Sequence, residues 1–154
     1  MAWTKTKTAV VAAVVIILAA RTTNVMERNS GDQDSFQGKS DARFDEAKKW
    51  ALAFIMFADA HGNQLPNNFD QAKAYVPGLS DSNWEIVSGG DENSFVNPSK
   101  TILLREKESR QFPGGKFLKV YAFADGHAQR ISSPDNNFAA LEKQRGFLIR
   151  PAKN

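Results

Sequence analysis

The chain of 154 residues contains no cysteine and only two histidines. The lack of cysteine excludes disulfides, thiolate zinc sites and cysteine nucleophiles. The sequence also has no His-Glu-x-x-His segment and no Gly-x-Ser-x-Gly segment, and neither Gly89-Gly90 nor Gly114-Gly115 is followed by the Lys-Ser or Lys-Thr of a phosphate-binding loop. With these signatures missing, we expect a protein that has no catalytic residues, is not an enzyme, and holds no cofactor or metal.

Long runs of charge of one sign are missing as well. The 20 lysines and arginines stand against 17 aspartates and glutamates, and the net charge is only +3. The basic residues are scattered after Arg21, whereas a nucleic-acid surface needs a clustered basic stripe with interleaved aromatics. We therefore expect no nucleic-acid partner. At 42% hydrophobic content, a chain of this length can build one modest core.

The only long apolar run is Ala9–Ala20, which basic residues flank on both sides. As a helix it would be about 18 Å long, short of a hydrocarbon core of about 30 Å, although flanking side chains that reach the interface make a marginal span possible. The same pattern fits a secretory signal with a cleavage site at Leu18-Ala-Ala20. We expect residues 1–21 to be a membrane anchor with a cytoplasmic N-terminus. If the segment were cleaved as a signal, the protein would instead be secreted.

Residues 22–39 are polar, include two glycines and predict a flexible tether. The folded head is expected to cover residues 40–154. Its strongest element is a helix from Asp41 to His61, in which apolar residues recur at spacings of three and four and Gly62 supplies the stop. Its aromatic stripe, which includes Trp50 and Phe54, could line a ligand or partner groove, but the core of the head is the preferred interpretation.

The remainder of the head predicts short helices and strands. Asn68 can cap a short helix, and Asp125-Gly126 predicts a tight type I′ hairpin turn with positive φ at both residues. Val120, Ala122 and Ala124 should point to one face of the sheet, and Tyr121 and Phe123 to the other. Glu106 and Glu108 are expected to be exposed charges at a strand end. The expected helices are Phe69–Tyr75 and Phe138–Gln144, and the expected strands are Trp84–Val87, Thr101–Arg105, Lys116–Phe123 and Ala128–Ser132. The predicted fold class is α+β, a long helix packed on an antiparallel sheet of about four strands.

Two segments carry a family resemblance: His61-Gly-Asn-Gln-Leu-Pro66 after the long helix, and Phe123-Ala-Asp-Gly-His127 in the hairpin, with Leu103-Leu-Arg-Glu106 on the strand before it. With these motifs, residues 41–131 resemble the head domain of type IV pilin-like proteins and type II secretion pseudopilins. The resemblance implies a structural and interaction module on a membrane-inserted helix, with no catalytic residues to carry over. Within these motifs and the helix we expect structural roles for a small set of residues: Asp125, Gly126, Trp50, Phe54, Gly62 and Pro66. The N-terminus lacks the Gly-Phe-Thr-Leu-Ile-Glu opening usual in that family.

Two metal sites remain as alternatives to the expectation of none. His61 and His127 could bind zinc with Asp59 or Asp125 if the fold brought them together. Hard oxygen ligands for calcium occur in the loop segment Asp91-Glu-Asn93, but without EF-hand spacing.

The resulting hypothesis is a membrane-anchored, non-catalytic, pseudopilin-like structural and interaction protein of the bacterial cell envelope. The N-terminal segment would contact the membrane, and the extracytoplasmic head would contact envelope proteins. An anchored regulatory or ligand-binding module is the alternative, and a secreted hydrolase of unrecognised type is a third possibility.

Overall fold

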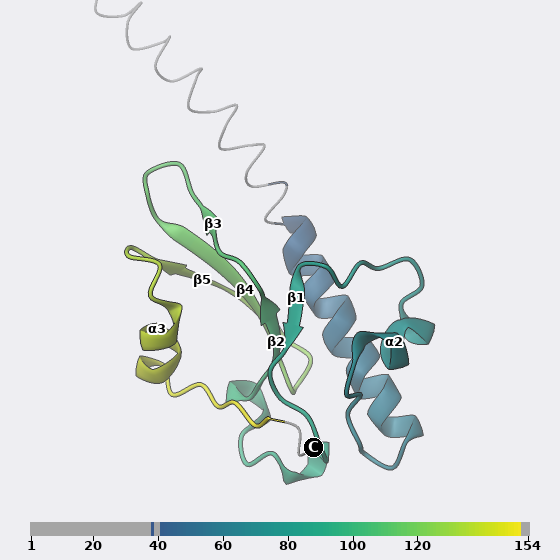
Figure 1. Ribbon diagram of the computed structural model, residues 1–154. Helices are drawn as coiled ribbons and strands as arrows, with labels where there is room; N and C mark the ends of the chain where they lie inside the picture. The colour runs from purple at the N-terminus through teal and green to yellow at the C-terminus, as the bar shows by residue number, and fades with distance from the viewer. Residues whose placement is uncertain (1–37, 39–40, 152–154) are drawn as a thin grey trace, which may run out of the picture. The chain divides into compact units, whose positions relative to one another are not determined.

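The computed structural model describes residue 38 and residues 41–151 (Figure 1). The chain divides after Gly38 into two units, and the second, Lys39–Asn154, contains the elements described below. The anchor predicted at residues 1–21 and, apart from Gly38, the tether predicted at residues 22–39 lie outside the described residues. In the part of the chain that is described, no helix is long and apolar enough to cross a membrane.

The first element of the head is a helix over residues 41–60, one residue shorter than predicted. Its buried face consists of small and aromatic residues at helical spacing, and Trp50 and Phe54 are both fully buried. Gly62, with φ of 65°, ends the helix, and the Asn63 backbone N–H donates to the Ala58 carbonyl at 2.8 Å. This is the long-range bond of a Schellman cap, so the predicted stop at Gly62 is confirmed.

The helix packs on an antiparallel sheet of five strands, which confirms the α+β fold class and corrects the number of strands (Figure 1). β4 is the central strand, and β5 pairs with it along one edge. Along the opposite edge, β4 pairs with β2 and, further along, with β3. β1 pairs with β2. β3 was not predicted because two residues carry no readable alternation. The strands are β1 Trp84–Ile86, β2 Ile102–Glu106, β3 Arg110–Gln111, β4 Phe117–Phe123 and β5 Ala128–Ser133.

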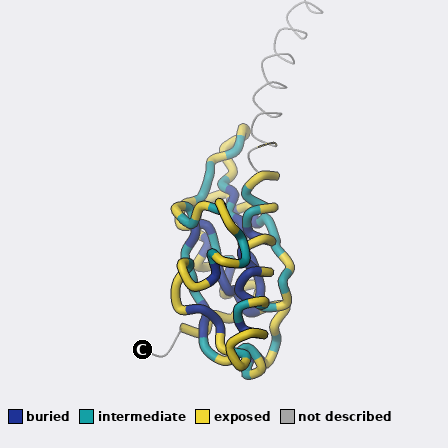
Figure 2. The backbone as a smooth tube through the Cα atoms, turned by 90° about the vertical axis from the view of Figure 1, so that its right-hand side faces the viewer, coloured by how far each residue is buried: buried dark blue, intermediate teal, exposed yellow. Residues whose placement is uncertain are grey.

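The side chains of β4 alternate between the two faces of the sheet, as predicted, and the head has two cores rather than the one that was expected. Val120 and Ala122 pack with the helix 41–60, whereas Tyr121 and Phe123 pack on the opposite face of the sheet. Phe138 of α3 (Phe138–Gln144) closes the second core. The predicted bounds of α3 are confirmed. Figure 1 shows the long helix and α3 on opposite sides of the sheet, and Figure 2 shows the buried backbone between exposed segments.

The hairpin between β4 and β5 differs from the predicted two-residue turn. The Gly126 N–H donates to the Phe123 carbonyl and the Phe123 N–H to the His127 carbonyl, both at 2.9 Å, so three residues form the loop. Only Gly126 has positive φ, at 86°, and Asp125 does not. This is the pattern of a three-residue loop in which glycine alone occupies the left-handed region, so the type I′ prediction was wrong.

Short elements complete the head. Asn68 caps α2 (Phe69–Ala72), as predicted, because its side chain accepts from the Gln71 N–H. The remaining short elements are the 3-10 helices η1 Lys73–Tyr75, η2 Glu92–Ser94 and η3 Pro98–Lys100. After α3 the chain returns to the start of β2, where Leu148 forms a parallel bridge with Thr101.

Candidate functional site

The residues predicted to have structural roles lie in the two cores or at turns. Pro66 is buried beside Leu65, whose N–H donates to the Gly90 carbonyl at 2.9 Å. A Cβ added at Gly126 would lie 3.3 Å from Ile55 Cδ1, so the hairpin loop rests against the helix 41–60. The Asp125 carboxylate accepts from the His127 backbone N–H at 3.2 Å and lies 2.5 Å from His127 Nδ1. The contacts between Asp125 and His127 are local and hold the hairpin loop in shape.

The two histidines have separate surroundings. His61 stacks on Phe57, and its Nδ1 lies 2.7 Å from the Phe57 carbonyl oxygen. His127 stacks on Phe123 and pairs with Asp125. Among the described residues, no group of three or more histidine, aspartate or glutamate side chains is arranged to hold a metal ion.

Replacing Gly126 with valine is expected to lower the melting temperature markedly. A Cβ at this φ costs about 1 kcal/mol or more, and the branched side chain would also press on Ile55. His127→Gln is the matched control and should change the melting temperature little, because the side chain is exposed. Thermal unfolding followed by circular dichroism measures both, and equal melting temperatures for the Gly126 variant and the parent would contradict the prediction.

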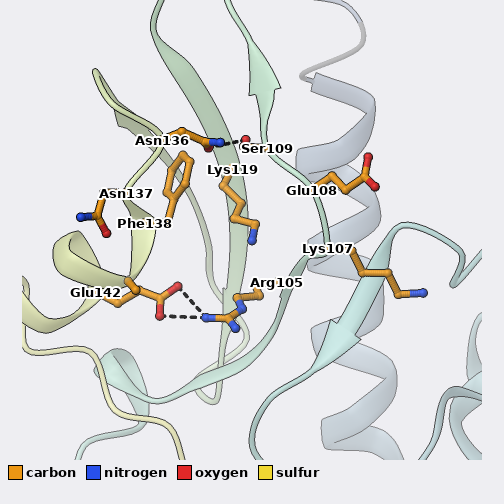
Figure 3. Close-up of a pocket in the computed structure, with 10 residues that line it drawn as sticks. Arg105, Lys107, Glu108, Ser109, Lys119, Asn136, Asn137, Phe138 and Glu142 are labelled. Carbon is orange, nitrogen blue, oxygen red and sulfur yellow. Dashed lines mark hydrogen bonds and ion pairs between the residues drawn. The ribbon is translucent and has the colours of Figure 1, made fainter.

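An open groove of about 560 Å³ lies on the α3 side of the sheet (Figure 3). Figure 3 shows Ser109 and Asn136 at one end, Arg105 and Glu142 at the other, and Lys119 between them. The walls come from β2, the β2–β3 connection, β4, the β5–α3 connection and α3. The lining is mostly charged and polar: Arg105, Lys107, Glu108, Ser109, Lys119, Asn136, Asn137, Phe138, Ala139 and Glu142.

Arg105 is the centre of an ion-pair network at one end of the groove. Its NH1 donates to both oxygens of Glu142 at 2.8 Å, and its Nε donates to Glu85 at 2.6 Å. Burial alone would lower the pKa of Arg105, but the hydrogen bonds to Glu85 and Glu142 hold it above its ordinary value. The Tyr121 hydroxyl donates to Glu142 at 2.9 Å, and burial followed by the Glu142 charge raises the pKa of Tyr121. The network therefore joins β1, β2, β4 and α3 through hydrogen bonds between their side chains.

Lys119 has no such partner. It lies on the same face of β4 as Phe117 and Tyr121, and its ammonium is 5.8 Å from the centre of the Phe138 ring. Among the described residues, no carboxylate forms an ion pair with it. Burial, and next the charge of Arg105, lower the pKa of Lys119. The groove thus contains a half-buried cation whose own charge is not neutralised by a direct contact.

A second buried carboxylate lies at the interruption between β2 and β3. Glu106 is only 2% exposed, and its Oε2 accepts from the Val120 backbone N–H at 2.8 Å. Arg110 pairs with it at 3.1 Å, and Arg43 of the helix 41–60 lies 4.0 Å away. The Glu106 carboxylate thus accepts the Val120 N–H in place of a backbone carbonyl of the neighbouring strand. The prediction that Glu106 is an exposed strand-end charge was therefore wrong, although Glu108 is exposed as expected.

Sequence reasoning did not identify the groove, yet one signal was present. The row of β4 residues facing α3 reads Phe117, Lys119, Tyr121 and Phe123, and a lysine interrupts an otherwise aromatic face. Such a break in the pattern marks a functional or strained position. The partners of the groove could not be paired from the sequence, because Arg105 and Glu142 are far apart in the chain.

Comparison of the chain with protein-family models, with curated proteins and with solved structures finds no match.

Proposed function

We propose that this protein is a membrane-anchored, non-catalytic structural and interaction protein of the bacterial cell envelope, similar to the pseudopilins. The observation that supports the proposal most is that both resemblance motifs are built around one helix. The segment from His61 to Pro66 ends the helix 41–60, and the hairpin loop with Gly126 rests against Ile55 of the same helix. One motif thus ends the helix and the other contacts it. A helix packed on an antiparallel sheet is the architecture that the resemblance implies.

The exposed side of that helix offers a surface for a protein partner. Leu52 and Met56 are 56% and 42% exposed, and their spacing of four residues brings them together on one helical face. In the proposed function, an envelope protein covers this pair when the head assembles with it.

A second candidate function is an anchored ligand-binding module outside the cytoplasm. The groove around Lys119 favours it, because ligand sites are concave and contain a few convergent polar groups. Anchoring is common to both functions, and a head that binds a ligand can still make protein contacts through the opposite side of the sheet.

Anchoring is tested by replacing Val14 and Ile16 with aspartate in the full-length chain. Each aspartate at the centre of a spanning helix costs several kcal/mol of insertion free energy, so most of the protein should leave the membrane fraction. The measurement is the distribution between membrane and soluble fractions after cell breakage, with the mature N-terminus determined by sequencing.

Val96→Asp is the matched control, because Val96 is 97% exposed in the head and lies far from the apolar run in the sequence. The control should remain with the membranes. If the double variant also remains there to the same extent as the parent, the anchor does not exist and the proposed function fails.

A further inference from the structure

The position of Lys119 is unfavourable for the folded chain alone. Its neighbours along the same face of β4 are aromatic, with Tyr121 fully buried on one side and Phe117 packed against the same core on the other. A lysine rarely lies in such a row unless its charge has a partner, because removing an ammonium from water costs free energy. The chain nevertheless places the ammonium in an open groove rather than against a carboxylate.

The carboxylates closest to this position in the fold are already engaged. Both oxygens of Glu142 accept from Arg105, and one of them accepts from Tyr121 as well. Glu85 accepts from Arg105 Nε. Turning either carboxylate to Lys119 would break the Arg105 network, and Glu108, which lines the same groove, lies apart from Lys119 (Figure 3) and forms no ion pair with it.

The charge of the groove limits the kind of partner. Arg105 is already paired with Glu85 and Glu142, and Lys107 donates to the Ser82 carbonyl, so Lys119 is the cation of the lining that no direct contact neutralises. A ligand with a single negative charge matches this one cation, whereas a doubly charged phosphate would face Glu108 and Glu142 with an uncompensated charge.

The other end of the groove supplies neutral hydrogen-bonding groups. The Ser109 hydroxyl donates to the Asn136 side-chain oxygen at 2.5 Å, and the Asn137 side-chain oxygen accepts from the Ala140 N–H at 3.1 Å. Both asparagine oxygens are thus engaged within the protein, and the amide NH₂ group of Asn136, which lies at this end of the groove (Figure 3), is the donor left for a ligand. Such donors suit a carbonyl or hydroxyl oxygen.

We propose that the groove binds a small molecule with one carboxylate, which pairs with the ammonium of Lys119, and with a carbonyl or hydroxyl group that accepts from Asn136. The site does not depend on membrane anchoring, so the failure of either proposal leaves the other standing. Lys119 is the specificity-determining residue, because it selects the charge of the ligand.

The test uses full-length protein in a zwitterionic detergent and N-acetyl-L-alanine as the probe, with backbone amide chemical shifts as the readout. Saturable shifts are expected at Lys119, Asn136 and Phe138. N-acetyl-L-alaninamide, which has the same shape without the charge, should cause none of them. Inorganic phosphate should bind more weakly than the probe.

Lys119→Met should weaken binding of the probe by at least about tenfold, because a hydrogen bond to a charged group is lost. Lys107→Met is the matched control: Lys107 lines the same groove but donates to the Ser82 carbonyl, and its loss should leave the affinity within about twofold. The melting temperature of Lys119→Met should rise, since methionine suits the aromatic face. Lys119→Gln, which keeps a polar side chain, provides a second variant if the first does not fold.

Three outcomes would overturn the site: no saturable shift with the probe, equal shifts in Lys119→Gln, or equal shifts with the neutral amide. Tighter binding of inorganic phosphate than of the probe would refute the assignment to a single carboxylate.

Discussion

Replacing Phe54 with alanine is expected to lower the free energy of unfolding by about 3–5 kcal/mol. Phe54 is fully buried, and its ring lies 6.3 Å from that of Trp50 and 5.8 Å from that of Phe69. These three rings join the long helix to the segment that follows it, so the neighbours cannot close the cavity without moving the helix. Urea unfolding followed by tryptophan fluorescence and circular dichroism measures the loss.

Leu52→Ala is the matched control for Phe54→Ala. It removes an apolar side chain from the same helix, but Leu52 is exposed, and the change should stay within about 0.5 kcal/mol. If the two substitutions have the same cost, the helix does not use the aromatic face as its core.

Replacing Glu106 with alanine is expected to cost about 3 kcal/mol, the second largest effect. The substitution removes the acceptor of the buried Val120 N–H and leaves the charge of Arg110 without this carboxylate. Glu108→Ala, two residues along the same chain segment, is the control and should have little effect because Glu108 is exposed. A loss below about 1 kcal/mol for Glu106→Ala would show that the interruption between β2 and β3 does not depend on the carboxylate.

Glu106→Gln separates the hydrogen bond from the charge. Burial raises the pKa of Glu106 and outweighs the opposite effects of Arg110 and the Val120 N–H, so the folded state binds a proton on this carboxyl more readily than the unfolded state. A group of this kind contributes most to stability below its unfolded pKa, and the contribution decreases as the pH rises through its folded pKa. Glutamine keeps an acceptor for Val120 without the charge, and the variant should lose clearly less stability than Glu106→Ala at pH 7.

The elements that the sequence predicted best are those with a local physical signal. The helix 41–60 carries a long apolar period and a glycine at its end, and α3 has an asparagine before it and a glycine after it, so both sets of bounds were close to the structure. β3 could not be predicted, because only the geometry of the connection between β3 and β4 brings its two residues into pairing with β4. The hairpin loop was misjudged because Asp125-Gly126 fits both a two-residue and a three-residue loop, and the pairing of Ala122 with Ala128 decides between them.

The candidate site depends on long-range pairing, which a single sequence does not encode in a readable way. Glu106 has the same local setting as Glu108, yet only Glu106 is buried, because the β4 backbone offers an N–H at that level. Glu142 lies near the end of a short helix, a position typical of a surface charge. Its hydrogen bonds with Arg105 and Tyr121 instead hold it beside the second core. Lys119 was the one readable anomaly, since its position in the aromatic row follows from strand alternation alone.

The return of the C-terminal segment to β2 has a consequence for biosynthesis. The Ile102 N–H donates to the Leu148 carbonyl at 2.9 Å, and the Gly89 N–H donates to the Arg150 carbonyl at 2.9 Å. A chain made from its N-terminus cannot form these bonds until Leu148 and Arg150 have left the ribosome, although the helix 41–60 and the sheet strands are synthesised earlier. The segment that includes Phe147 therefore closes the second core late in synthesis, and until then its aromatic face is open to chaperones.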